Sequence, residues 1–238
     1  MTKIIFLDAA GTLFDVRGSV GEVYGKLASS WGITISNEEL NAAFFQSFAN
    51  SSPMAFPGRK LAKIPQLEFE WWLAVATKAF QIAGVFNQFS DFTKFFTELY
   101  AHFATAEPWF VYPDVFPALN RWQKQGIELA VVSNFDSRLY PVLKALDLAE
   151  YFTSVTISTE VGAAKPDSQI FTAALQKHNC LAENVLHIGD SFKADYCGAR
   201  NAGLKAIWLN RQQKKLDLSK LGLIDFKKVE EFASLDFI

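Results

Sequence analysis

Short apolar runs recur along the chain, and each is followed by turn residues and then by a stretch with helical periodicity. This alternation is typical of a parallel sheet with crossover helices, because strands that are buried on both faces are continuously apolar. The predicted strands are 3–7, 129–133, 154–158, 184–188 and 205–209, and the predicted core helices are 114–125, 137–146, 167–178 and 193–202. The pattern therefore predicts a doubly wound, Rossmann-like α/β core.

Between residues 16 and 108 the pattern changes to long amphipathic stretches without a convincing strand. Ser19 and Ser36 each stand three positions before a glutamate, which is the spacing of a capping box at a helix start. Prolines and a glycine in 51–65 predict a loop. We therefore expect an all-helical cap domain at 16–108, inserted into an α/β core domain of residues 1–15 and 109–238, with 227–238 as a helix or tail.

Composition narrows the class of protein. The chain has 238 residues, which is long enough to bury a full core, and 23 Lys and Arg against 25 Asp and Glu. The net charge of -2 gives no long-range attraction for nucleic acid or an acidic membrane. Two cysteines make no disulfide framework, and the apolar run before Asp8 is too short for a signal peptide or a membrane span. A cytoplasmic protein is expected, and its oligomeric state is left open.

Polar side chains stand where the predicted strands end. Asp8 follows the first strand, Ser133 ends the second, Lys165 precedes a helix, and Asp190 follows the fourth strand with Asp195 just beyond. In an open parallel sheet, ligands collect at the carboxyl ends of the strands. Three converging carboxylates form an all-oxygen site that suits Mg²⁺, whereas burying them without a cation would be costly.

Each of these residues also has an ordinary structural explanation. A strand-end serine commonly bonds to local backbone, a loop lysine is usually solvated, and Asp195 could stabilise a helix N-terminus. His187 lies within an apolar strand and is expected to be a buried, hydrogen-bonded histidine. The chain has no zinc-binding Cys/His spacing, no Walker loop and no Gly-x-Ser-x-Gly elbow.

Together and in this order, the motifs around Asp8, Ser133, Lys165 and Asp190 resemble the four sequence motifs of the haloacid dehalogenase superfamily. The resemblance covers the whole chain and implies a hydrolase with the helical cap of the first cap class, which closes over the substrate. Within the superfamily, the chain looks most like the subgroup called haloacid dehalogenase-like hydrolase domain-containing protein 3.

The resemblance also implies roles for individual residues. Asp8 would attack phosphorus to form an aspartyl-phosphate, with Ser133 and Lys165 completing the catalytic set. Mg²⁺ would be held by Asp8, the backbone carbonyl of Ala10, Asp190 and Asp195. The phosphorylated substrate would be bound by Thr12, Ser133, Asn134 and Lys165.

One position departs from the family pattern. Phosphatases of the superfamily carry a second Asp two positions after the nucleophile, where it protonates the leaving alcohol and activates water, and this chain has Ala10 there. Loss of a general acid or base typically lowers the rate ~10²- to 10⁴-fold. The expected function is a Mg²⁺-dependent phosphatase of a small phosphorylated metabolite, with slow turnover, a good leaving group or a base supplied from elsewhere.

Three other functions fit the same sequence. Phosphonoacetaldehyde hydrolases have Ala at this position but need a lysine from the cap, and 2-haloacid dehalogenases lack the second Asp but need no metal. A catalytically silent protein that binds a phosphorylated ligand is the third. The candidates for the cap lysine are Lys26, Lys60, Lys63 and Lys78, and the candidates for selecting the substrate are Arg17, Arg59 and Lys60.

Overall fold

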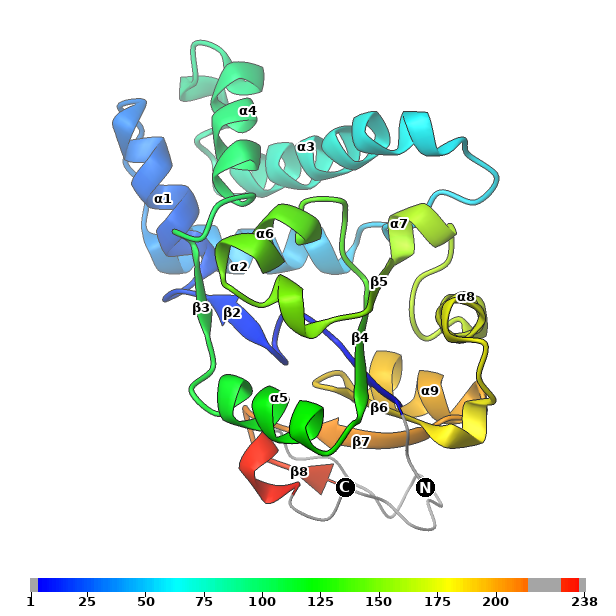
Figure 1. Ribbon diagram of the computed structural model, residues 1–238. Helices are drawn as coiled ribbons and strands as arrows, with labels where there is room; N and C mark the ends of the chain where they lie inside the picture. The colour runs from blue at the N-terminus through cyan, green and yellow to red at the C-terminus, as the bar shows by residue number, and fades with distance from the viewer. Residues whose placement is uncertain (1–3, 214–227, 236–238) are drawn as a thin grey trace, which may run out of the picture.

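The computed structural model describes residues 4–213 and 228–235, and its main sheet has six parallel strands in the order β5-β4-β1-β6-β7-β8 (Figure 1). Because β1 lies between β4 and β6, the residues that follow β1 are at the centre of the carboxyl edge of the sheet. The strands are β1 (Ile4–Leu7), β4 (Glu128–Ser133), β5 (Ser154–Ile157), β6 (Val185–Gly189), β7 (Lys205–Leu209) and β8 (Lys228–Val229).

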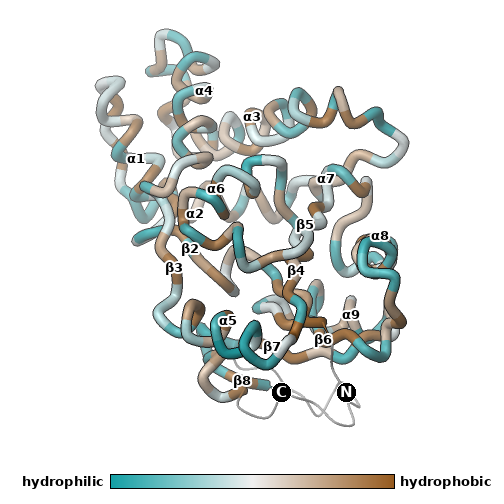
Figure 2. The backbone as a smooth tube through the Cα atoms, viewed as in Figure 1, coloured by the Kyte–Doolittle hydropathy of each residue, from teal (hydrophilic) through white to brown (hydrophobic). Residues whose placement is uncertain are grey.

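Alternate residues of the central strands enter two different apolar clusters, one on each face of the sheet. In β1, Ile5 and Leu7 join one cluster, and Ile4 and Phe6 join the other. All four are buried, which is the reason that the strand is continuously apolar and not alternating. The chain is hydrophobic along β4 and β6 and hydrophilic along the outer turns of α5 (Figure 2). The flanking helices are α5 (Val115–Lys124), α6 (Leu139–Ala145), α8 (Ser168–His178) and α9 (Gly198–Asn201).

The predicted α/β fold is confirmed, with three local differences. The segment predicted as one helix over 193–202 begins as a π-helical turn, Phe192–Cys197, and becomes α-helical only at α9. A short helix that was not predicted, α7 (Ser158–Val161), follows β5 directly. Within the predicted C-terminal helix or tail, β8 is an edge strand and Phe232–Ser234 is a 3₁₀ turn, whereas 227 and 236–238 lie outside the described residues.

Four helices separate β2 from β3 in the sequence and lie beyond the carboxyl edge of the sheet (Figure 1). Ser19 and Ser36 cap the first two as predicted, since their hydroxyls accept hydrogen bonds from the backbone N–H of Glu22 and Glu39 at 3.1 and 3.3 Å. That these helices form a cap domain of residues 16–108 stays a prediction. They are α1 (Val20–Ser30), α2 (Asn37–Ala49), α3 (Ile64–Ile82) and α4 (Phe92–His102).

An antiparallel ribbon joins the sheet to these helices. It consists of β2 (Phe14–Val16) and β3 (Trp109–Val111), with Asp15 paired to Phe110. Both strands lie at the predicted domain boundaries but were not predicted, because three residues are too few to show an alternating pattern. Within the described residues, no helix is long and apolar enough to cross a membrane.

Candidate active site

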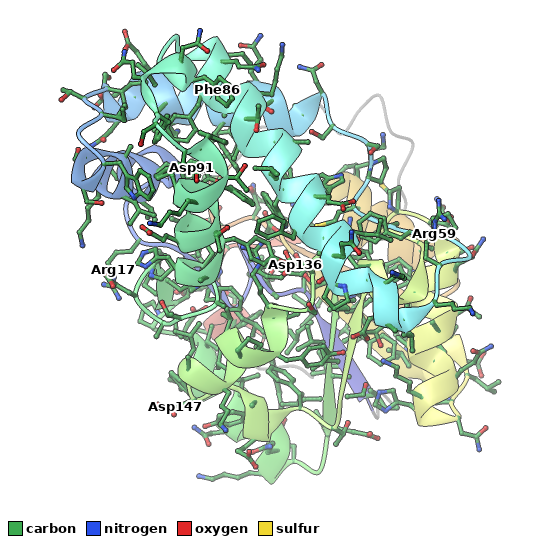
Figure 3. The ribbon with its side chains drawn as sticks, turned by 90° about the horizontal axis from the view of Figure 1, so that it is seen from above. Arg17, Arg59, Phe86, Asp91, Asp136 and Asp147 are labelled. Atoms are coloured by element: carbon green, nitrogen blue, oxygen red, sulfur yellow. The ribbon has the colours of Figure 1, made fainter. Side chains whose placement is uncertain are left out.

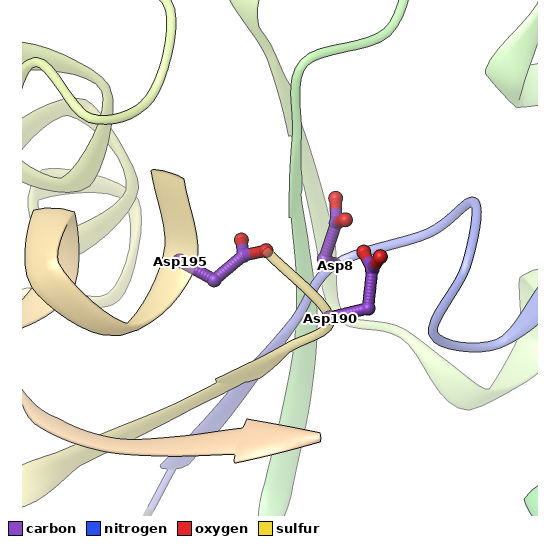
Figure 4. Close-up of side chains that lie close together, drawn as sticks. All are labelled: Asp8, Asp190 and Asp195. Atoms are coloured by element: carbon purple, nitrogen blue, oxygen red, sulfur yellow. The ribbon is translucent and has the colours of Figure 1, made fainter. Parts of the chain in front are cut away.

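Three aspartates converge at the centre of the carboxyl edge. Asp8 follows β1, Asp190 follows β6, and Asp195 comes from the π-helical turn that succeeds β6 (Figure 4). The backbone N–H of Asp8 bonds to the carbonyl of Ile188 at 3.0 Å, so the pairing of β1 with β6 continues to the cluster. One carboxylate oxygen from each aspartate lies within 4.8 Å of the other two.

A buried lysine joins two of these carboxylates. The Nζ of Lys165 lies 2.7 Å from Oδ1 of Asp8 and 2.5 Å from Oδ1 of Asp195, and it donates to the carbonyl of Val132 at 2.9 Å. The backbone of Lys165 is fixed by the Asn134 side chain, which accepts from its N–H at 2.7 Å and donates to its carbonyl at 2.8 Å. The three N–H groups of the ammonium are therefore aimed at defined acceptors.

Burial and the ammonium act in opposite directions on the two carboxyls. Burial raises the pKa of Asp8 above its usual range, and Lys165 and a hydrogen bond with Ser133 counteract that rise. Burial also acts to raise the pKa of Asp195, but Lys165 and His187 outweigh it and lower that pKa. The pKa of Lys165 is raised, because Asp195 and Asp8 outweigh its burial. Lys165 and Asp195 thus remain charged at neutral pH.

Asp195 has further donors around it. His187 Nε2 lies 2.9 Å from its Oδ1, and the backbone N–H of Ser191 donates to its Oδ2 at 2.9 Å. His187 is fully buried, and its burial lowers its pKa, so the ring is a neutral donor to the carboxylate. The expectation that His187 is a buried, hydrogen-bonded residue is confirmed.

Two glycines leave space for the carboxylates. A Cβ on Gly11 would lie 2.7 Å from Cγ of Asp190, and a Cβ on Gly189 would lie 2.2 Å from Cγ of Asp195. Gly11 also has a φ of +80°, a left-handed conformation that side-chain-bearing residues rarely adopt. Any larger residue at either position would displace an aspartate of the cluster.

The structure gathers most of the predicted site residues. Ser133 is buried and acts to lower the pKa of Asp8, and Ala10 and Asn134 line a cavity beside the cluster. The Thr12 side chain is fully buried, and its hydroxyl has no hydrogen-bond partner among the described residues. The assigned roles, including substrate binding by Thr12 and the Ala10 carbonyl as a metal ligand, stay predictions.

The carboxylate set fits a divalent cation. Three carboxylates converge here, and the ammonium of Lys165 pairs with two of them, so among these four described residues carboxylates outnumber ammonium groups. Mg²⁺ prefers carboxylate and carbonyl oxygens, and these donors meet at the end of two adjacent strands. Asp8, Asp190 and Asp195 are the residues that would hold it.

Two buried acidic residues near the site were missed. Glu68 of α3 accepts from the Ser137 N–H at 3.0 Å and from the Thr159 hydroxyl at 2.5 Å, and the Ser137 hydroxyl also donates to it. Asp136 accepts from the Trp72 indole at 2.6 Å. These bonds fasten α3 to the loop after β4 and to α7. Nothing in the sequence around Glu68 or Asp136 distinguishes them from solvent-exposed acidic residues.

The cavity lies between the ribbon, α2, α3 and the loops after β1 and β4, and has a volume of about 410 Å³. Arg17, Arg59 and Lys60, the candidates for selecting the substrate, are exposed and do not line it. Figure 3 shows Arg17 and Arg59 near opposite sides of the molecule, with Asp136 between them. Aromatic side chains form a large part of the cavity lining, among them Phe44, Phe48 and Trp72.

The comparisons with known proteins agree with this geometry. A family model described as haloacid dehalogenase-like hydrolase matches residues 2–203. The chain belongs to this family. It is 34% identical over 202 residues to the mouse haloacid dehalogenase-like hydrolase domain-containing protein 3, covering 85% of this chain and 79% of the mouse protein. The resemblance to that subgroup and the assignment as a hydrolase are confirmed.

Solved structures show the same fold. A dehalogenase structure superposes with a TM-score of 0.71 at 20% identity, covering 98% of this chain and 95% of the other. A phosphatase of the family from Thermococcus onnurineus superposes with a TM-score of 0.64 at 22% identity, covering 98% and 96%. At such identities the likeness concerns the fold, and the reaction must be argued from the site.

Proposed function

We propose that this hydrolase is a Mg²⁺-dependent phosphohydrolase that acts on a small phosphorylated molecule through an aspartyl-phosphate on Asp8. The observation that carries the proposal is the grouping of the buried Asp8, Lys165 and Asp195 with the partly buried Asp190 at the carboxyl edge. An ionised Asp8 supplies the nucleophile, and the remaining charges suit the transfer of a phosphoryl group.

The chain's own residues divide the work. Asp8 attacks phosphorus, while Lys165 orients its carboxylate and, with a hydrogen bond from Ser133, opposes the rise in its pKa that burial causes. Asp195 keeps Lys165 charged and in place, and Asn134 fixes the lysine backbone. When bound, Mg²⁺ would supply charge neutralisation for the phosphoryl oxygens.

Proton transfer is the weak point of this site. Ala10 borders the cavity and offers no proton to a leaving group. Among the described residues that line the cavity, Asp15 is the carboxylate, and it accepts from the Tyr112 hydroxyl at 2.9 Å and the Val16 N–H at 2.7 Å. We therefore expect slow turnover of esters whose alcohol must be protonated as it leaves.

Dehalogenation is the second candidate, because a dehalogenase structure shares the fold with a TM-score of 0.71. In that reaction Asp8 would attack carbon, and Asp190 beside it would have no evident use. The phosphonatase alternative receives no support, because Lys26, Lys60, Lys63 and Lys78 are all exposed and none lines the cavity. A silent binding protein would retain Mg²⁺ affinity without turnover.

The test is phosphate release from a panel of phosphorylated metabolites and an activated aryl phosphate, with and without Mg²⁺, for wild type and Asp8→Asn. The proposal expects release that requires both Mg²⁺ and Asp8. Chloride release from a 2-haloacid without Mg²⁺ would instead establish dehalogenation. No release of either ion would leave a binding role and overturn the proposal.

A further inference from the structure

The cavity borders the loops that carry the site residues. Ala10, Asn134 and Ala164 belong to the loops that carry the nucleophile, the strand-end serine and Lys165, and all three line the cavity. A group attached to a phosphoryl centre at Asp8 would therefore enter this space. The side chains that line the cavity therefore indicate the chemical nature of the leaving group.

The lining forms an aromatic slot between α2 and α3. The ring planes of Phe44 and Phe48 lie within 6° and 24° of that of Trp72, at centroid distances of 6.4 and 5.9 Å. Trp71 stands edge-on to Trp72 at 4.9 Å. Phe48 is 44% exposed, so this ring is partly accessible to solvent. Flat rings with one open side suit stacking against another flat, apolar ring.

The charged groups of the lining are already engaged. Arg138 pairs with the fully buried Asp136 at 2.6 Å, and its guanidinium lies 3.9 Å from the ring centroid of Tyr100. Asp15 is bonded through both carboxylate oxygens. Among the described lining residues, Arg138 is the cation, so a second phosphate or a carboxylate on the substrate would meet no uncommitted positive charge.

Ala10 points to the same chemistry independently. Without an acid at this position, the ester oxygen must leave as an anion. A phenol ionises near pKa ~10, whereas the pKa of an aliphatic alcohol is several units higher, so its anion is a much poorer leaving group. An oxygen attached directly to an aromatic ring is therefore the leaving group that least needs the missing proton.

We propose that the substrate is an aryl phosphate monoester, whose apolar ring occupies the aromatic slot formed by Phe44, Phe48, Trp71 and Trp72. This inference rests on the proposed phosphohydrolase function. Asp8 forms a bond to phosphorus as the aryl ester bond breaks, and the aryloxide takes its proton from water. A second water then attacks phosphorus, which releases inorganic phosphate and restores the Asp8 carboxylate, and the proton of that water passes to solvent.

Two probes test the inference: 2-naphthyl phosphate, which carries a flat ring, and glycerol 3-phosphate, which carries a polar alcohol. The kcat/KM for each is compared in wild type, in Phe48→Ala, and in Phe86→Ala as a control. Phe86 is also half-buried among aromatic residues of the helical segment, but it does not line the cavity and lies far from Asp136 (Figure 3).

We expect 2-naphthyl phosphate to be the better substrate and Phe48→Ala to lower its kcat/KM by about 3- to 10-fold, the effect of one aromatic contact. Phe86→Ala should leave that value unchanged, and the preference over glycerol 3-phosphate should shrink only in Phe48→Ala. Equal or better use of glycerol 3-phosphate, or an equal loss on both substrates in Phe48→Ala, would overturn the inference while leaving the phosphohydrolase intact.

A binding measurement separates the two proposals. In Asp8→Asn, which should not turn over, 2-naphthyl phosphate should quench tryptophan fluorescence, because Trp71 and Trp72 line the cavity. Adding Phe48→Ala to this variant should weaken its affinity for 2-naphthyl phosphate by about the same 3- to 10-fold. An affinity that is unchanged by Phe48→Ala would overturn the aromatic slot, whether or not wild type releases phosphate.

Discussion

At the scale of single residues, the side chain at position 10 limits which reaction steps the site can support. The structure supplies the buried carboxylate of Asp8, a charged lysine and two further carboxylates, yet the side chain that borders the cavity two positions after Asp8 is a methyl group. The site therefore has a group for the proposed nucleophilic attack, whereas position 10 has none for the proposed proton transfer to the leaving group and from water. This imbalance favours leaving groups that depart as anions.

Restoring the carboxylate should relieve that imbalance. In Ala10→Asp we expect kcat for an alkyl phosphate to rise, because a general acid and base returns to the site. The upper limit of the rise is the usual contribution of such a group, ~10²- to 10⁴-fold. Ala10→Asn is the matched control, since it has nearly the same size and transfers no proton. Steady-state phosphate release measures both, and equal rates in the two variants would mean that proton transfer does not limit turnover.

At the scale of elements, α3 is held to the α/β core by buried polar bonds as well as by apolar packing. Glu68 of α3 accepts from Ser137 and Thr159, and the indole of Trp72 donates to Asp136. These bonds set where α3, and with it one wall of the cavity, lies relative to Asp8. Loss of a buried acceptor leaves its donors unpaired, which costs free energy.

Glu68→Ala should therefore lower the free energy of unfolding by about 1–3 kcal/mol for each donor left unpaired. Glu70→Ala is the control, because Glu70 is exposed on the same helix and has the same charge. Denaturant unfolding followed by circular dichroism measures the difference. Similar unfolding free energies for the two variants would show that the Glu68 bonds contribute little to stability.

The elements differ in how far the sequence could predict them. Strands such as β4 and β6 are buried on both faces, so their nearly continuous apolar runs were sufficient to predict them from the sequence. The ribbon strands β2 and β3 have three residues each, too few for a period, and the π-helical turn at Asp195 has no local signature. Asp8, Lys165 and Asp190 were found from their motifs, whereas Glu68 and Asp136 depend on packing between distant segments.

Considered as a whole molecule, the fold brings four separate stretches of chain to one edge of the sheet. Residues from the ends of β1, β4 and β6 and from the loop before α8 meet around Lys165, and the excess negative charge there opposes folding unless a cation offsets it. Binding of a cation to the folded state alone would raise the stability of the entire chain.

Mg²⁺ should accordingly raise the melting temperature. At 100 times its Kd, a ligand specific for the folded state adds about 2.7 kcal/mol, and each kcal/mol raises Tm by about 2–4 °C for a chain of this size. Asp190→Asn should reduce the shift, whereas Asp147→Asn, an exposed site with positive φ that asparagine tolerates, should not. Differential scanning fluorimetry measures the Mg²⁺-induced rise in Tm of both variants. A rise in Asp190→Asn as large as in wild type would contradict this metal site.

The most direct test of the central claim is to look for the phosphoryl group on Asp8. Wild type is mixed with 2-naphthyl phosphate and Mg²⁺, quenched in acid during turnover, and analysed by intact and peptide mass spectrometry. Because position 10 cannot activate water, we predict that the aspartyl-phosphate accumulates on the peptide containing Asp8 and is absent in Asp8→Asn. Turnover by wild type without a phosphoryl group on Asp8, or turnover by Asp8→Asn at the wild-type rate, would contradict the account.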